Sequence, residues 1–244
     1  MTARSGASLA DTPRAPSRHR KGALWERLSE RTLQVSETFV SIQGEGCRAG
    51  WPSAFVRLTG CGLRCRWCDT TYAYSGGRKQ SLRSLESWVV STGLSRVCLT
   101  GGEPLLQPDL LLLAERLVTE HAYDVVLETG GDQDVSAVAR EVSIVLDIKL
   151  PASKMTDRMR WTNLDQLGAG DELKLVVADR NDYEMARELL RERLKSFPGE
   201  ILLSPVHGEL AADTLAQWVL SDRLEARVQI QLHRLLWPSK TRGA

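Results

Sequence analysis

Short apolar runs alternate with segments of helical periodicity along most of the chain, from about residue 32 onward. Several of these runs are almost continuously apolar, which is typical of strands that are covered on both faces. An extended segment is expected between Val35 and Ile42, and strands are then predicted at Ala54–Leu58, Val97–Thr100, Asp124–Glu128, Ser143–Ile148, Glu172–Val177, Ile201–Leu203 and Arg227–Gln231.

Helices are predicted between these strands, at Leu82–Ser91, Pro108–His121, Val135–Arg140, Asn181–Leu194 and Ala211–Leu220. Asn181 has the character of an N-cap, and Glu184 three residues later completes a capping-box pattern. Strands that alternate with helices imply parallel pairing through right-handed crossovers. The predicted fold class is therefore α/β with mostly parallel strands, in a single domain over residues 32–244.

Residues 1–31 differ from the rest in composition. They hold seven Lys or Arg against three Asp or Glu, and their first half is rich in Ser, Pro and Ala. Such a segment has too few apolar residues to form a packed core, so a basic, disordered tail is expected, with a short amphipathic turn near Trp25 and Leu28. The apolar stretch of a secretory signal is missing. A transit peptide and an arm that contacts RNA remain alternatives to a solvated tail.

The composition of the whole chain excludes several classes of protein. The 244 residues carry a formal charge of +1, so no global basic field points to nucleic acid. No apolar run approaches the ~20 residues that cross a bilayer, so no membrane association is expected. Five cysteines are too few for a disulfide scaffold, and their odd number leaves one unpaired. Reduced thiols in a cytoplasmic protein are therefore expected.

Residue types that carry chemistry follow several predicted strands. Thr100-Gly101-Gly102-Glu103-Pro104 follows one strand, Glu128-Thr129-Gly130-Gly131 follows the next, Lys149 closes another, and Ser204-Pro205 ends a later one. Because the carboxyl ends of parallel strands share one face, the sequence predicts a shared site there.

Cys61, Cys65 and Cys68 form a C-x3-C-x2-C motif flanked by glycines. Three close thiolates repel one another unless a metal neutralises them, and soft sulfur ligands suit zinc or iron–sulfur clusters. A structural zinc site usually has a second cysteine pair, whereas Cys47 and Cys98 lie apart and fit a buried residue or a free thiol. A four-iron cluster with one open iron is favoured, while zinc and a plain buried-thiol loop stay open.

The motif, with Trp67 before its last cysteine, resembles that of the radical S-adenosylmethionine (SAM) superfamily, and residues 101–104 resemble that superfamily's segment for the methionine amino group. Residues 41–46, the run Cys68-Asp69-Thr70 and residues 231–233 narrow the resemblance to the 7-carboxy-7-deazaguanine synthase family of the queuosine pathway. The resemblance spans about Ser36 to Pro238. It implies a compact, incomplete (β/α) barrel of the radical SAM type.

The resemblance also implies a reaction and its cofactors. The enzyme would be a lyase that converts 6-carboxy-5,6,7,8-tetrahydropterin to 7-carboxy-7-deazaguanine with loss of ammonia. Its cofactors would be a [4Fe-4S] cluster, S-adenosyl-L-methionine and Mg²⁺. The reduced cluster would cleave SAM to methionine and a 5′-deoxyadenosyl radical, which would abstract hydrogen from the pterin. A homodimer and a flavodoxin or ferredoxin as electron donor are the expected partners.

Individual residues acquire roles from the same resemblance. Cys61, Cys65 and Cys68 would hold the cluster, and Thr70 would bind Mg²⁺. SAM would contact Trp67, Cys68, Asp69, Gly102, Asp147, Ile148, Lys149, Ser204, Pro205, Val206 and His207. The substrate would contact Ile42, Gln43, Gly44, Glu45, Arg57, Thr100, His233 and Pro238. Pro238 matches a position at the family's C-terminus, but here the chain continues through Ser239.

Three positions carry a further expectation of their own. A buried Arg57 needs an anionic partner, either the substrate's carboxylate or a structural salt bridge. Glu103 is expected to anchor its loop rather than to act as a base. His233 is expected to end the last strand, near the mouth of the site.

Two other functions fit part of the pattern. An activase that places a glycyl radical on a partner protein would share the cysteines and the Gly-Gly-Glu-Pro loop. A non-enzymatic zinc-binding module would share the cysteines alone. Turnover of the pterin separates the first from the synthase, and metal analysis separates the second.

Overall fold

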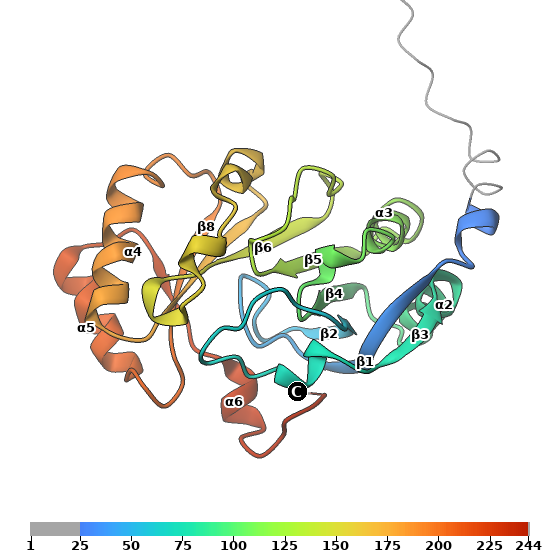
Figure 1. The fold of residues 1–244 in the computed structure, drawn as a ribbon, viewed down its shortest axis with the longest axis horizontal. Helices are drawn as coiled ribbons and strands as arrows, with labels where there is room; N and C mark the ends of the chain where they lie inside the picture. The colour runs from blue at the N-terminus through green and yellow to red at the C-terminus, as the bar shows by residue number, and fades with distance from the viewer. Residues whose placement is uncertain (1–24, 244) are drawn as a thin grey trace, which may run out of the picture.

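Within residues 25–243, which the computed structural model describes, the strands form one nine-stranded sheet in the order β3-β1-β2-β4-β5-β6-β7-β8-β9 (Figure 1). The strands are β1 Thr32–Ile42, β2 Pro52–Leu58, β3 Arg78–Ser81, β4 Arg96–Gly101, β5 Asp124–Thr129, β6 Ser143–Ile148, β7 Glu172–Val177, β8 Glu200–Pro205 and β9 Arg227–Val228. Strands β2 and β4 to β9 pair in parallel, and β1 pairs antiparallel with β2 and β3. The two end strands do not meet, so the prediction of an open, mostly parallel α/β barrel is confirmed.

Helices cover the outer side of this sheet. They are α2 Leu82–Ser91, α3 Leu110–His121, α4 Arg180–Glu192 and α5 Ala212–Asp222. The short helix α6 Leu232–Leu236 buries none of its residues and is not part of this layer. Short 3-10 helices are η1 Thr71–Tyr74, η2 Pro104–Leu106, η3 Pro151–Ser153, η4 Thr156–Arg158 and η5 Trp161–Gln166. Figure 1 shows α2 and α3 beside one half of the sheet and α4 and α5 beside the other. Two apolar clusters fill the space between helices and strands.

The pleat of the parallel strands separates an outer from an inner face. Leu99 of β4 and Leu127 of β5 belong to an outer cluster under the helices. The residues just before them point the other way and form a small inner cluster, which consists of Phe55, Cys98, Val126 and Val145. The next inward position along each strand is therefore free to carry a functional side chain.

Several predicted elements need correction. Residues 135–140 are turns rather than a helix, although Val135 is buried in the core. Helix α4 begins after Asp179, whose side chain accepts from the Asp182 amide at 2.9 Å, so Asn181 lies inside the helix and does not cap it. The last strand ends at Val228 instead of residue 231, and β3 was not predicted.

The predicted tail overlaps the folded domain. Residues 25–28 are helical as expected, and the Trp25 side chain is only 8% exposed against the core. Its indole nitrogen donates to Glu86 at 2.9 Å. The boundary at residue 31 is therefore too late, while residues 1–24 of the predicted tail lie outside the described residues. Among the described helices, none has the length and apolar character that a membrane span requires.

Candidate active site

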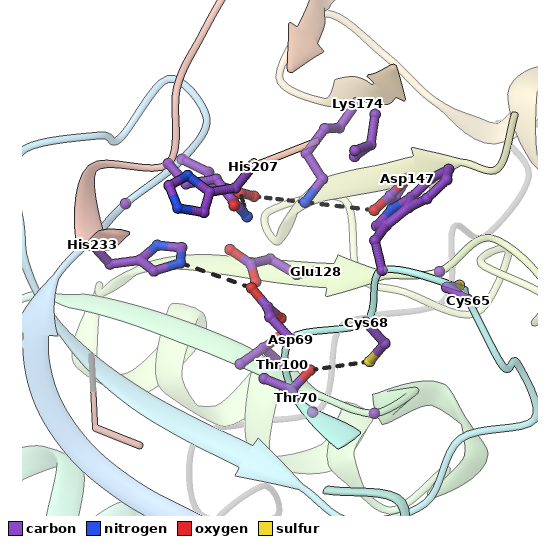
Figure 2. A pocket seen from close by; sticks show the side chains of 18 of the residues that line it. Cys65, Cys68, Asp69, Thr70, Thr100, Glu128, Asp147, Lys174, His207 and His233 are labelled. Atoms are coloured by element: carbon purple, nitrogen blue, oxygen red, sulfur yellow. Dashed lines mark hydrogen bonds and ion pairs between the residues drawn. The ribbon is translucent and has the colours of Figure 1, made fainter. Parts of the chain in front are cut away.

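A cavity of about 540 Å³ lies at the carboxyl ends of the parallel strands. Arg57 of β2, Thr100 of β4 and Glu128 of β5 line it from one side, and Asp147 of β6 and Lys174 of β7 line it from the other. Arg57 is the register partner of Thr100, and Asp147 is the partner of Lys174. The pleat therefore points one polar side chain inward from each of five strands, as Figure 2 shows for four of them.

The three motif cysteines open on this cavity from the loop after β2. The loop leaves β2 through Gly60, whose φ of +105° lies in a region that side chains avoid. Gly102 packs against the loop so closely that an added Cβ would meet Gly60 O and stand 2.7 Å from Cys61 Cβ. The cysteine loop thus packs directly against the turn after β4.

The chemistry of these thiols fits a metal cluster. Burial is the largest cause of the raised pKa of the Cys61 and Cys65 thiols. The neutral thiols are therefore favoured when no cation lies beside them. All three are free and partly exposed to the cavity. A cationic iron–sulfur group would favour the thiolates, which are the form that binds iron. Within residues 25–243, no three His, Cys, Asp or Glu side chains are arranged to hold a single metal ion.

Glu103 fastens the turn on which the cysteine loop rests. Its buried carboxylate accepts from the amides of Leu105 at 3.0 Å and Gly130 at 2.7 Å, and from the Thr129 hydroxyl at 2.9 Å. Desolvation raises the pKa of Glu103 to about 7 although these donors lower it. Glu103 joins the loops after β4 and β5, as its predicted anchoring role requires.

A chain of charged side chains crosses the cavity. Lys174 Nζ lies 2.6 Å from Glu45 and 3.5 Å from Asp147, and Lys149 Nζ lies 2.9 Å from the same Asp147 oxygen (Figure 2). Burial alone would lower the pKa of both lysines, but the facing carboxylates raise it above the ordinary value. Both lysines therefore stay protonated. The second oxygen of Asp147 is buried and has no partner among the described residues, so it remains available to a ligand.

The hairpin between β1 and β2 closes one end of the cavity. Gln43 donates to Glu128 at 3.0 Å and accepts from the Gly44 amide at 2.8 Å. The second oxygen of Glu45 accepts from Gln231 at 2.6 Å. Gly44 is in close contact with His233, which a Cβ at residue 44 would strike. The predicted substrate segment 42–45 is thereby fixed to β5, β7 and the start of α6.

Arg57 has an anionic partner of its own. Its Nε donates to Glu37 at 2.9 Å, and the Tyr72 hydroxyl donates to the same oxygen at 2.7 Å. The terminal nitrogens of Arg57 have no hydrogen-bond partner among the described residues, and the residue still lines the cavity. The salt bridge and a role toward a ligand are thus compatible.

Thr70 and Asp69 lie beside the last cysteine. The Thr70 hydroxyl is 3.7 Å from Cys68 Sγ, and Asp69 Oδ2 is 3.2 Å from Arg234 and 3.9 Å from His233 Nε2 (Figure 2). Burial would raise the pKa of Asp69, but His233 and Arg234 hold it well below its usual range. His233 reaches this position from α6, not from the end of a strand as predicted.

The cavity gathers most of the predicted site residues and leaves out three. Besides the residues above, it is lined by Ile42, Trp67, Gly102, Pro205, Val206 and His207. Ile148 points to the outer face and is buried in the core, and Ser204 is buried without reaching the cavity. Pro238 is exposed and does not line it either; Lys240 and Thr241 do.

Some lining residues had no role assigned from the sequence. Glu128 and Lys174 lie in predicted strands, and the period-two pattern of these strands places both side chains on the inner face with Arg57. Tyr72, Arg234 and Lys240 lie in segments with no such pattern. Only the folded structure brings these three to the cavity.

Comparison with known proteins identifies the family. A profile described as the radical SAM superfamily matches residues 55–191. The chain is 40% identical over 228 residues to the 7-carboxy-7-deazaguanine synthase of Koribacter versatilis, covering 86% of this chain and 100% of that protein. The chain belongs to the 7-carboxy-7-deazaguanine synthase family. The enzyme of that name from Chlorobaculum tepidum is 40% identical over 219 residues, covering 88% of this chain and 99% of the relative.

A solved structure supports the fold of this 7-carboxy-7-deazaguanine synthase family member. QueE from Escherichia coli superposes with a TM-score of 0.71 at 23% identity, over 84% of this chain and 97% of that one. Membership of a radical SAM family implies a [4Fe-4S] cluster and SAM as cofactors. The glycyl-radical activase and the zinc module are not favoured by these relatives.

Proposed function

We propose that the chain binds 6-carboxy-5,6,7,8-tetrahydropterin in the cavity and converts it to 7-carboxy-7-deazaguanine with loss of ammonia, in queuosine-type biosynthesis. One observation carries this proposal beyond family membership. The three cysteines and polar side chains from five strands open on the same 540 Å³ cavity. A reactive radical must form beside its substrate, and a shared cavity provides that proximity.

The cofactor side of the cavity would be formed by the cysteine loop and the strand ends. Cys61, Cys65 and Cys68 would hold the cluster, leaving one iron for SAM. When bound, the cluster supplies one electron for reductive cleavage of SAM, and this chemistry belongs to the cofactor. The chain's own part is to bind and orient SAM through Gly102, Asp147 and other lining residues, which are Trp67, Asp69, Lys149, Pro205, Val206 and His207.

The substrate side would be formed by the hairpin and by β2. Gln43 and Glu45 offer amide and carboxylate groups to the amino-pyrimidine edge of the pterin, with Thr100 and His233 nearby on the cavity wall. The terminal nitrogens of Arg57 suit the substrate carboxylate, since a guanidinium binds a carboxylate in a planar fork. Glu37 and Tyr72 fix the Arg57 side chain, so little rotamer entropy is lost on binding.

Mg²⁺ would be bound between the two sides by Thr70. A hydroxyl is a hard oxygen ligand, and Mg²⁺ commonly completes its shell with waters and substrate oxygens. The family resemblance further supports a homodimer in the cytoplasm that receives electrons from flavodoxin or ferredoxin.

The decisive test is anaerobic reconstitution with iron, sulfide, SAM, reductant, Mg²⁺ and the carboxylated pterin, followed by mass detection of product. We expect a brown protein with iron and sulfide near 4:4, the ratio that one four-iron cluster requires (about four of each). Cys65→Ala should lose colour and turnover, whereas the matched control Cys47→Ala, at the exposed cysteine outside the cavity, should keep both. A colourless zinc protein, or an iron protein that never cleaves SAM, would contradict the proposal.

A further inference from the structure

The segment that follows α6 folds back over the mouth of the cavity. Lys240 and Thr241 belong to the lining, whereas Pro238, which family resemblance places at the substrate, does not. Figure 1 shows the chain leaving α6 and ending beside η1, on the side of the sheet where β1 and β2 lie. Residues 239–243 are here called the strap.

Two aromatic contacts hold the strap in place. Lys240 donates its amide to Trp237 O at 3.0 Å, and its Nζ lies 5.2 Å from the Trp237 ring centroid. The Arg242 guanidinium lies 4.5 Å from the ring centroid of Tyr72. Cation–π contacts of this kind are stabilising even at exposed positions. The strap is thus attached at both ends, once to α6 and once to η1.

The strap also changes the balance of charge around Arg57. Tyr72, under Arg242, donates to Glu37, and Glu37 is the ion-pair partner of Arg57. Glu37 therefore offsets the positive charge that Arg57 would present to a ligand. Neither Lys240 nor Arg242 forms a salt bridge with any residue that the structure describes. The cavity that Arg57 lines thus gains one further cation, Lys240, which no carboxylate of the described chain compensates.

We propose that Lys240 is a specificity-determining residue, which favours a substrate with a carboxylate over its uncharged analogue, and that Arg242 positions it by fixing the strap on Tyr72. The proposal rests on the proposed function, because it concerns the carboxylate of the pterin. A cation at the rim of a low-dielectric cleft raises the local concentration of an anionic ligand and stabilises it on entry. Arg57 then binds the carboxylate inside, while Lys240 supplies the net charge that the Glu37 pair removes.

The test compares Lys240→Gln with wild type in steady-state turnover of 6-carboxytetrahydropterin. Because Lys240 is exposed, we expect KM to rise roughly two- to fivefold at low salt with kcat unchanged, the range of an exposed ion pair. The rise should disappear in about 1 M salt, where the Debye length falls to about 3 Å. The affinity for tetrahydropterin without the carboxylate should not change. Lys195→Gln, at an exposed lysine outside the cavity, is the matched control.

A second variant tests whether the position of the strap matters. Arg242→Gln should raise KM for the carboxylated pterin in the same salt-dependent way, since it releases the strap that carries Lys240. An unchanged KM in Lys240→Gln, or an equal loss of affinity for the uncharged analogue, would overturn the proposal. Failure of the wild-type protein to turn over the pterin at all would instead overturn the proposed function.

Discussion

The carboxylate of Glu45 and the ammonium of Lys174 lie 2.6 Å apart inside the cavity, and both side chains are less than 15% exposed. The pair joins the hairpin proposed to bind substrate to the sheet, and Asp147 extends it to the strand proposed to bind SAM. One ion pair therefore links the two halves of the candidate site.

Breaking this pair should destabilise the protein and abolish turnover. Lys174→Met leaves Glu45 as a buried carboxylate without its cation, which typically costs roughly 3–5 kcal/mol. We expect urea unfolding to show a loss of this order, with product formation falling below detection. Adding Glu45→Gln to the variant removes the uncompensated charge, so much of the stability should return while turnover does not. Equal stability of the single and double variants would refute the assigned pairing.

Gly102 should tolerate no side chain. Gly102→Ala places a methyl group against Gly60 O and 2.7 Å from Cys61 Cβ, so the cysteine loop has to move. Overpacking of this kind costs about 1–3 kcal/mol, and we expect lower iron content after reconstitution together with a large loss of SAM cleavage. Gly170→Ala is the matched control, because no atom lies within 4 Å of its Cβ position. Iron content equal in both variants would show that the loop does not rest on Gly102.

The sequence predicted the elements that local patterns determine. Strands β6 and β7 and helix α2 have the predicted bounds, because buried apolar runs and an amphipathic period are local signals. The cap of α4 was wrong because Asn181 and Asp179 both fit the pattern locally. In the structure Asp179 accepts from the Asp182 amide, and the Asp182 side chain accepts from the amides of Ala178, just before the helix, and of Ala152, which is distant in sequence.

The candidate site likewise has residues that local sequence patterns predict and residues that only the folded chain brings together. The cysteines form a contiguous motif and could be found from spacing alone. The family resemblance assigns Ile148 to SAM together with its neighbours Asp147 and Lys149, yet the pleat turns the residue between them to the outer face. The contact between Arg242 and Tyr72 joins segments far apart in the chain, so no pattern along the sequence contains it.

Thr70 should influence Mg²⁺ and not iron. Thr70→Ala removes a hydroxyl that lies 3.7 Å from Cys68 Sγ but leaves every cysteine in place. We expect full colour and iron content, with a higher Mg²⁺ concentration needed for half-maximal product formation. Thr70→Ser keeps the oxygen and should restore the wild-type response. A Mg²⁺ dependence that is unchanged in Thr70→Ala would remove this residue from the metal site.

Glu103 should make stability fall as pH rises. Burial raises its pKa from 4.5 to about 7, so between these values the folded state holds a proton that the unfolded state has lost. The stabilising contribution is complete below about pH 4.5 and is lost as pH rises through about 7, with a span of about 3 kcal/mol. Glu103→Gln stays neutral throughout.

The measurement is urea unfolding of wild type and Glu103→Gln over about pH 5–8. The free energy of unfolding of wild type should fall relative to that of the variant as pH rises, and the difference should level off above about pH 8. A constant offset is also expected, since an amide cannot accept from Leu105, Thr129 and Gly130 as a carboxylate does. Glu188→Gln, at an exposed carboxyl of α4, should follow wild type. Parallel curves for wild type and Glu103→Gln would show that Glu103 is ionised throughout, held by its three donors despite burial.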